Sequence, residues 1–275
     1  MNSFKELCIR LRKKDYSLAE IAKRTKRSKT SVYFHIRGIP LSKTKIGLIR
    51  KAYGARFAAL AYARKGKSKR GFKKIKHWDD SAVVLVSHLI FDGEIKGSGC
   101  VYTNRSSVLL KKIESAMKEI YIHEPKRYFD KKTGVSKIAY FNVALSAHLR
   151  PKAKELLAGV FDLSVEQKRL FLQAFFDDEG CIDFKPIRNV RRVRGYQKDV
   201  HILAVIHSLL KEFKITSKVQ LPNEVVVTGK ENLENFQKEI NFSSGIYMNG
   251  KRANSVWKVD TEKRELLQRA IYSFK

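Results

Sequence analysis

The stretch QAFFDDEG, residues Gln173 to Gly180, places three acids in a row behind an aromatic run, in a chain whose formal net charge is +30. The apolar run predicts a helix. Gly180 predicts its end, because glycine tolerates the left-handed conformation that follows many last turns. The acids would then lie at the negative end of the helix dipole, where each costs about 0.3–1 kcal/mol. A compensating positive charge is therefore expected nearby.

The same pattern occurs earlier in the chain. Residues 85–93 read LVSHLIFDG and residues 172–180 read LQAFFDDEG, so that each stretch runs into an acid followed by glycine. The two final acids, Asp92 and Glu179, are 87 residues apart. Self-similarity at a fixed spacing predicts two similar half-domains.

The segments after the two acids also match each other. A strand, a turn and a second strand are predicted after both glycines, with a longer turn in the second copy. The second strand ends in Asn104–Arg105 in the first copy and in Gln197–Lys198 in the second, an amide followed by a cation in both. A helix and another hairpin come next in each copy. The prediction is an α+β fold with two pseudo-symmetric αββαββα half-domains, at about 82–160 and 165–272 within a domain of residues 81–275.

These features resemble the LAGLIDADG homing endonuclease family in its single-chain, two-motif form, over about residues 82–272. The resemblance implies that the two motif helices pack side by side at a pseudo-two-fold axis, and that two antiparallel sheets form a DNA-binding saddle. It implies that Asp92 and Glu179 bind metal in one shared site. It also places the two amide–cation pairs beneath the scissile phosphates as further catalytic residues.

The chemistry of the residues agrees with that implication. Hydrolysis of a phosphodiester needs hard cations that neutralise charge on the phosphate and the leaving oxygen. Mg²⁺ prefers oxygen ligands and usually takes one or two carboxylates together with substrate phosphates. Mg²⁺ is therefore the expected cofactor, with Mn²⁺ as a substitute. A cation from each half, Arg105 and Lys198, can stabilise the charge that develops.

Three other polar residues of the motifs are not expected to bind metal. Asp177 and Asp178 come before the last acid of the second motif and are expected to cap, to orient a neighbour or to be solvated. His88 stands where an apolar residue is usual and is expected to be structural. Positions 87 and 174, where the helix backbones approach each other, hold small residues.

The charge distribution favours a nucleic-acid partner. The chain has 275 residues with 57 Lys and Arg against 27 Asp and Glu, and residues 1–80 alone hold 24 basic and five acidic residues. Strong positive potential favours a polyanion through counterion release. A membrane partner is not expected, since no long basic amphipathic helix stands out. The three cysteines form no CxxC pair, and no secretory signal is visible, which favours an intracellular, cytoplasmic and reduced protein. The single-chain, two-motif form to which the resemblance points implies a monomer.

Residues 1–40 predict a small all-helical module. Ser17 followed by Glu20 is a capping box, and Ser28 can cap the next helix. Two short helices joined by a tight turn resemble a helix-turn-helix, although Lys26 stands where glycine is usual. The second helix would enter the major groove of DNA. It would offer Lys29, Thr30, Ser31, Tyr33 and Phe34. Residues 41–80 predict a basic helical linker.

Further DNA contacts are expected from basic residues on two hairpins of the half-domains. In Arg192-Val193-Arg194 the alternation suits a strand with one polar face. The predicted contacts are Lys126, Arg127, Arg188, Arg191, Arg192 and Arg194.

Three functions fit this sequence. The first is a site-specific, Mg²⁺-dependent double-strand DNA endonuclease. The second is a DNA-binding transcriptional regulator that keeps the fold without cleavage, which the helix-turn-helix favours and the acid pair disfavours. The third is an intron maturase that binds structured RNA, which basic charge alone does not distinguish. No intein splicing signals are present.

Overall fold

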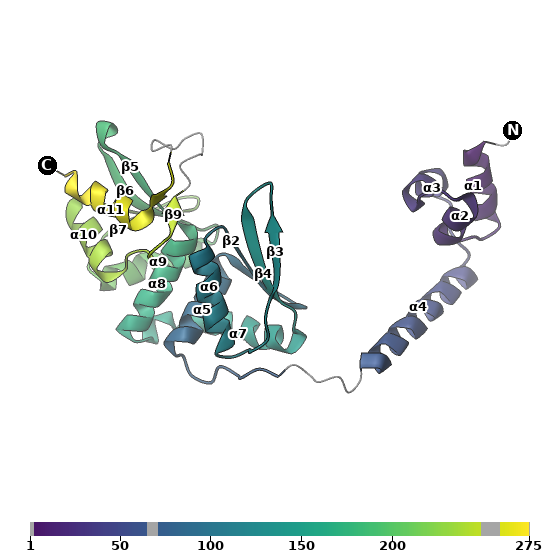
Figure 1. The fold of residues 1–275 in the computed structure, drawn as a ribbon, viewed down its shortest axis with the longest axis horizontal. Helices are drawn as coiled ribbons and strands as arrows, with labels where there is room; N and C mark the ends of the chain where they lie inside the picture. The colour runs from purple at the N-terminus through teal and green to yellow at the C-terminus, as the bar shows by residue number, and fades with distance from the viewer. Residues whose placement is uncertain (1–2, 65–70, 249–258, 275) are drawn as a thin grey trace. The chain divides into compact units, whose positions relative to one another are not determined.

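The computed structural model describes residues 3–64, 71–248 and 259–274. The chain divides into two compact units, Met1–Lys69 and Arg70–Lys275 (Figure 1). Each unit has its own hydrophobic core.

The first unit is entirely helical in its described part. Its helices are α1 (Phe4–Lys13), α2 (Leu18–Thr25), α3 (Lys29–Ile36) and α4 (Lys43–Arg64). Ser17 and Glu20 form the predicted capping box, and Ser28 caps α3. Cys8, Ile21, Val32 and Ile36 form the buried centre of this unit. Lys26 ends α2 with φ of 52°, the left-handed conformation that usually favours glycine.

The segment predicted as one basic helical linker, residues 41–80, has two different parts. Helix α4 covers Lys43–Arg64, and residues 65–70 lie outside the described residues. Residues 71–79 are not helical. Ile75 is buried in the core of the second unit, and Phe72 and Trp78 pack against that core. Their apolar side chains hold the end of the predicted linker on the second unit.

The first half of the second unit follows the predicted order helix, hairpin, helix, hairpin, helix. Its elements are α5 (Asp80–Phe91), β1 (Gly93–Lys96), β2 (Gly99–Asn104), α6 (Ser107–Lys118), β3 (Lys126–Asp130), β4 (Val135–Tyr140) and α7 (Val143–Gly159).

The second half repeats this order and then extends it. Its elements are α8 (Val165–Glu179), β5 (Gly180–Lys185), β6 (Val190–Tyr196), α9 (Val200–Glu212), β7 (Ser217–Gln220), β8 (Glu224–Thr228) and α10 (Lys230–Glu239). A small two-stranded sheet of β9 (Tyr247–Met248) and β10 (Thr261–Glu262) comes next, and then α11 (Lys263–Tyr272).

The two four-stranded antiparallel sheets have equivalent topologies, β1-β2-β4-β3 and β5-β6-β8-β7. The glycine after each motif acid begins the first strand and pairs with an equivalent position: Gly93 with Tyr102, and Gly180 with Gly195. The predicted α+β class and the repeated order of elements are confirmed.

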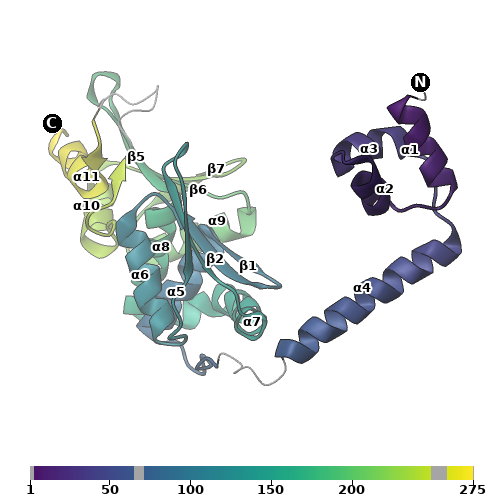
Figure 2. The same ribbon diagram turned by 45° about the vertical axis from the view of Figure 1, so that its right-hand side comes forward.

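Helices α5 and α8 pack side by side at the centre of the unit (Figure 2). Both are mostly apolar and largely buried, as expected for helices enclosed on all sides. Ser87 and Ala174, at the positions predicted to be small, are completely buried. This packing brings the C-terminal ends of the two motif helices together.

None of the described helices is long and apolar enough to cross a lipid bilayer.

Candidate metal and nucleic-acid site

The two motif acids lie at the ends of the paired helices, where each is half-buried. Asp92 caps α5, and Glu179 is the last residue of α8. Burial raises the pKa of Asp92 to about 7, with a further contribution from the charge of Asp178. Burial and, to a smaller extent, the charges of Asp92 and Asp178 together raise the pKa of Glu179 to about 7. The two carboxyl groups are therefore close enough to repel each other.

The glycine that follows each acid is required by close packing rather than by a left-handed backbone. Gly180 has φ of −89°, so the left-handed conformation predicted from the sequence is wrong. A Cβ on Gly180 would collide with the carbonyl oxygen of Phe176, and one on Gly93 would lie 2.5 Å from the Cα of Leu89. In both halves the chain passes directly from the motif helix into a strand that packs against the same helix.

The two predicted amides occupy equivalent places before the next helix. Asn104 Oδ1 accepts a hydrogen bond from the backbone N–H of Ser106 at 2.9 Å, and Ser106 caps α6. Gln197 Oε1 accepts from the backbone N–H of Asp199 at 3.3 Å, and Asp199 caps α9. Asn104 also donates from Nδ2 to Asp92 Oδ2 at 2.7 Å. The amide of the first half thus touches the acid of its own half.

The two predicted cations are exposed. Arg105 donates from Nε to the carbonyl oxygen of Thr133 in the β3–β4 turn at 3.1 Å. Lys198 lies between β6 and α9 with an exposed side chain. Neither cation forms a hydrogen bond with Asp92 or Glu179 within the described parts of the chain, so both remain available to a ligand.

The three consecutive acids of the second motif point in three directions, because successive helical residues are about 100° apart. Asp177 is buried. It accepts hydrogen bonds from the backbone N–H of Ser243 at 2.8 Å and from its hydroxyl at 2.6 Å, with Lys112 at 3.5 Å. The expectation that Asp177 could be solvated is therefore wrong, and it instead anchors the chain after α10.

Asp178 points toward the other motif helix. Its buried carboxylate meets His88 Nδ1 at 2.8 Å and accepts a hydrogen bond from the Tyr102 hydroxyl at 2.6 Å. His88 is completely buried, which fits the structural role predicted for it. Solvation of Asp178 is likewise excluded, because its side chain has no exposed surface.

A buried lysine supplies the positive charge expected beside the acids. Lys263, at the start of α11, donates from Nζ to the carbonyl oxygens of Phe176 and Asp177 at 3.1 and 2.8 Å. Burial lowers the pKa of Lys263, whereas the charges of Asp177, Asp178 and Asp92 act in the opposite direction. Lys263 closes the last turn of α8 and offsets the negative charge there. No local pattern marks it in the sequence, because it lies more than 80 residues after the helix that it caps.

The basic residues of β6 divide between the two faces of their sheet. Val193 is buried, and Gly195 lies against the ring of Phe175 in α8, so this face is turned toward the helices. Arg192 and Arg194 lie on the opposite face. Arg192 donates from Nε and Nη2 to Asp183 at 3.0 and 2.7 Å, and Arg194 pairs with Glu224. The polar strand face predicted from the alternation exists, and acids order its two arginines.

Two of the predicted DNA contacts instead lie on the faces turned toward the helices. Arg191 donates from Nε to the Ser273 hydroxyl at 2.6 Å and from Nη2 to the Ser273 carbonyl oxygen at 2.8 Å. Arg127 pairs with Glu114 of α6 at 2.9 Å and with Glu124 at 3.2 Å, while 56% of its side-chain surface remains exposed, so its contact with DNA stays a prediction. Their positions in strands explain this, because neighbours along a strand point to opposite faces. Arg191 thus ties β6 to Ser273, the residue that follows α11.

The other predicted contacts are exposed, as Arg127 is. They are Lys126 at the start of β3, Arg188 in the β5–β6 turn, and Lys29, Thr30, Ser31 and Tyr33 along α3. Phe34, next to Tyr33, is also exposed, with 59% of its surface accessible.

The donor set at the acid pair fits a hard cation. No three Asp, Glu, His or Cys side chains among the described residues come together as a complete metal cage. Mg²⁺ commonly binds with only one or two protein carboxylates, since water and phosphate oxygens complete its shell. A cation would stabilise two desolvated carboxylates whose pKa values are raised by burial and by neighbouring negative charge.

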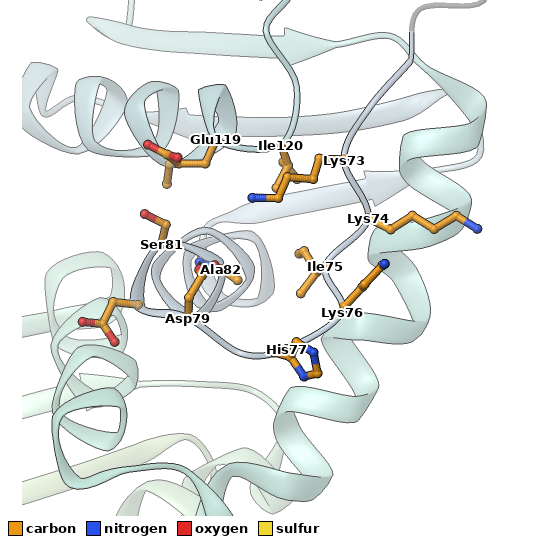
Figure 3. Close-up of a pocket in the computed structure, with 12 residues that line it drawn as sticks. Lys73, Lys74, Ile75, Lys76, His77, Asp79, Ser81, Ala82, Glu119 and Ile120 are labelled. Atoms are coloured by element: carbon orange, nitrogen blue, oxygen red, sulfur yellow. Dashed lines mark hydrogen bonds between the residues drawn. The ribbon is translucent and has the colours of Figure 1, made fainter.

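A separate pocket of about 630 Å³ lies at the other end of α5 (Figure 3). It is formed by the 73–77 segment, the start of α5 and the end of α6. Its charges are mixed, with Lys73 and Lys76 beside Asp79 and Glu119. Because α5 is 12 residues long, this pocket is about 18 Å along the helix axis from Asp92. It is not part of the acid site.

Comparison with known proteins supports the family at the level of one domain. Residues 166–241 match the LAGLIDADG-like domain, which confirms that part of the resemblance. No curated protein matches the chain in sequence.

Among solved structures, full-length DUF199/WhiA from Thermatoga maritima is 15% identical, with a TM-score of 0.47 over 72% of this chain. This chain covers 62% of that protein. I-DmoI in complex with DNA and Mn is 14% identical, with a TM-score of 0.45 over 58% of this chain and 96% of that one. The N-terminal LAGLIDADG domain of DUF199/WhiA is 17% identical, with a TM-score of 0.42 over 61% of this chain and 86% of that one. At these values the likenesses carry no inference about activity.

Proposed function

We propose that this protein binds double-stranded DNA and hydrolyses both strands with Mg²⁺ held between Asp92 and Glu179. The observation that carries the proposal is the meeting of two desolvated carboxyls at the ends of paired helices, each with a pKa raised to about 7. A protein that only bound DNA would gain nothing from a repulsive acid pair close to phosphates.

Mg²⁺ would neutralise negative charge on the scissile phosphate and on the leaving oxygen. Asp92 and Glu179 would bind it as carboxylates, which requires that both lose their protons. Asn104 holds one oxygen of Asp92, and Gln197 occupies the equivalent place in the second half. Arg105 and Lys198 would each approach a phosphate and stabilise charge that develops during cleavage.

DNA binding would be shared between the units. In the second unit, Arg192, Arg194, Lys126 and Arg188 provide positive charge away from the helices. In the first unit, α3 would enter a major groove with its exposed polar and aromatic side chains. Because the two halves of the second unit differ in sequence, the protein would act as a monomer on a long, asymmetric site.

The second candidate is a transcriptional regulator that keeps the fold without cleaving DNA. The observation that favours it is the separate helical unit, whose α2 and α3 are joined by a short turn and whose α3 is exposed along one side. A regulator would use this unit for specificity and would leave the acid pair unused.

One experiment separates the two candidates. The full chain is incubated with DNA that carries the flanks of its own gene, with Mg²⁺ or with EDTA, alongside Asp92→Asn. The nuclease predicts linear product only with wild type and Mg²⁺, and equal DNA binding by both proteins. Tight, specific binding with intact DNA in every lane would favour the regulator and overturn the nuclease.

A further inference from the structure

A chain of buried hydrogen bonds begins on one motif helix, passes through the other, and ends at Asp92. His88 of α5 contacts Asp178 of α8 at 2.8 Å, and the Tyr102 hydroxyl of β2 donates to the other oxygen of Asp178 at 2.6 Å. Asn104 Nδ2 then donates to the Tyr102 oxygen at 3.3 Å and to Asp92 Oδ2 at 2.7 Å. In the hydrogen bonds from Tyr102 to Asp178 and from Asn104 to Tyr102 and Asp92, the chemistry of the groups fixes which one donates.

The equivalent positions in the other half are apolar. His88 and Phe175 are both the fourth residue of their motifs, and Phe91 and Asp178 are both the seventh. Where His88 meets Asp178, Phe175 meets Phe91 with ring centroids 5.2 Å apart. Where Tyr102 fills the space on β2, the paired position on β6 is Gly195, which leaves room for the Phe175 ring. One half therefore has a polar cluster of His88, Asp178 and Tyr102. At the equivalent place the other half has the rings of Phe175 and Phe91, with Gly195 leaving space for the Phe175 ring.

The two motif acids differ accordingly. Asp92 is held by Asn104, whose other amide atom is fixed by the backbone of Ser106. For the Glu179 carboxylate, no hydrogen-bond partner is found among residues 3–64, 71–248 and 259–274. A side-chain hydrogen bond thus orients the Asp92 carboxylate, whereas no such bond to the Glu179 carboxylate exists among the described residues.

We propose that Tyr102 and Asp178, with His88 behind them, are positioning residues that orient Asp92 alone and make the two metal-binding acids inequivalent. This inference rests on the proposed function, since it concerns the same acid pair. Neither Tyr102 nor Asp178 is among the residues that would hold the metal. Tyr102 acts through Asn104. Asp178 acts by holding the Tyr102 hydroxyl, in addition to the direct effect of its charge on the pKa of Asp92.

The geometry explains why each member is needed. Burial beside Asp178 raises the pKa of Tyr102, so that its hydroxyl keeps its proton and donates to Asp178. The Tyr102 oxygen is then free to accept from Asn104. Without the hydroxyl, the Asn104 amide loses one of the two acceptors that fix its plane. Groups that orient a metal ligand from behind typically contribute about 10–100-fold to metal affinity.

The test is the affinity of the full chain for Mn²⁺, measured by the electron paramagnetic resonance signal of free Mn²⁺ at pH 8 in the absence of DNA. Tyr102→Phe is expected to weaken Mn²⁺ binding about 10-fold. The matched control is Tyr121→Phe. Tyr121 is equally buried, packs on Tyr140, and has a hydroxyl without a partner in the described parts of the chain. The control is expected to stay within about twofold of wild type, since it alters no group that touches Asn104.

A second pair of variants covers the case in which Tyr102→Phe fails to fold. His88→Leu removes the contact with Asp178, whereas His88→Asn can restore a donor at the place of Nδ1. His88→Leu is expected to weaken Mn²⁺ binding several-fold and His88→Asn to rescue it. A role in stability alone would move the unfolding midpoint without this difference in Mn²⁺ affinity.

Asp92→Asn distinguishes the possible failures. If it abolishes Mn²⁺ binding while Tyr102→Phe and His88→Leu bind as wild type does, the positioning role is overturned and the metal site stands. If Asp92→Asn binds Mn²⁺ as wild type does, both the metal site and the positioning role are overturned.

Discussion

Replacing Asp92 by Asn should make the metal-free protein more stable at high pH. Folding raises the pKa of Asp92 from 3.8 to about 7, so the folded state binds more protons than the unfolded state between those values. Stability therefore falls as pH rises through this window. The full contribution is present below about pH 4 and is lost above about pH 7. Glu179, whose pKa is also raised to about 7, acts in the same direction.

The gain in stability expected for Asp92→Asn is set by how far folding raises the pKa of Asp92. About three pKa units at 1.36 kcal/mol each give an upper limit of about 4 kcal/mol for Asp92. Partial exposure of the carboxyl reduces this to about 2 kcal/mol. For a unit of this size, that corresponds to about 4–8 °C in Tm. The Asn side chain keeps an oxygen for Asn104, so the packing of the site should survive.

The assay is urea unfolding in EDTA at pH 5 and pH 8.5. Wild type should be less stable at pH 8.5 than at pH 5. Asp92→Asn should exceed wild type by about 2 kcal/mol at pH 8.5 and by less than half as much at pH 5, where only the unfolded carboxyl has ionised. Saturating Mg²⁺ should stabilise wild type and leave the variant unchanged. A variant that is less stable than wild type at pH 8.5 would refute the reasoning, since it would mean that the carboxylate is stabilised where it lies.

Other changes test the surroundings of the site. Lys263→Met should lower the free energy of unfolding by about 1–3 kcal/mol, because it leaves the carbonyl oxygens of Phe176 and Asp177 without their donor. Urea denaturation measures this, and an unchanged or higher stability would contradict it. Arg192→Ala should make the plot of log DNA affinity against log salt concentration shallower by about 0.9, whereas Arg191→Ala should leave that slope unchanged. Equal slopes for the two variants would show that the two strand faces do not differ in DNA contact. A chain beginning at Gly71 should fold and bind DNA with a shallower salt slope. One beginning at Ser81 should be about 2–3 kcal/mol less stable than that, because it lacks buried Ile75, and equal stability would contradict the anchoring role of this segment.

Much of the architecture can be predicted because its signals are local. The two acid–glycine ends, the hairpins after them and the amide–cation pairs are all readable within short windows of sequence. They are enough to pair Asp92 with Glu179 and to align Asn104 with Gln197. The capping box at Ser17 is equally local, and the structure contains it.

The features that the sequence does not reveal depend on strand faces and on distant contacts. In the sequence, Arg191 and Arg127 belong to runs of basic residues and look the same as their neighbours. In the structure, neighbouring strand residues point to opposite faces of the sheet, so Arg191 and Arg192 have different surroundings. Tyr102 lies two residues before Asn104 and thus on the same strand face. That spacing is a sequence signal that could have identified Tyr102 as a neighbour of the acid site. The partners of Lys263 and of Asp177 are far away in the chain, and nothing local to either residue indicates them.

The central claim is that the acid pair binds a metal ion for DNA cleavage. The most direct measurement begins with sites selected from random double-stranded DNA by the full chain in Ca²⁺. The selected DNA is then exchanged into Mg²⁺ under single-turnover conditions, with wild type, Asp92→Asn and Glu179→Gln. Double-strand breaks at a fixed position with wild type, and intact but bound DNA with both variants, are the predicted result. Selected DNA that wild type binds tightly and leaves whole in Mg²⁺ and in Mn²⁺ would contradict the account.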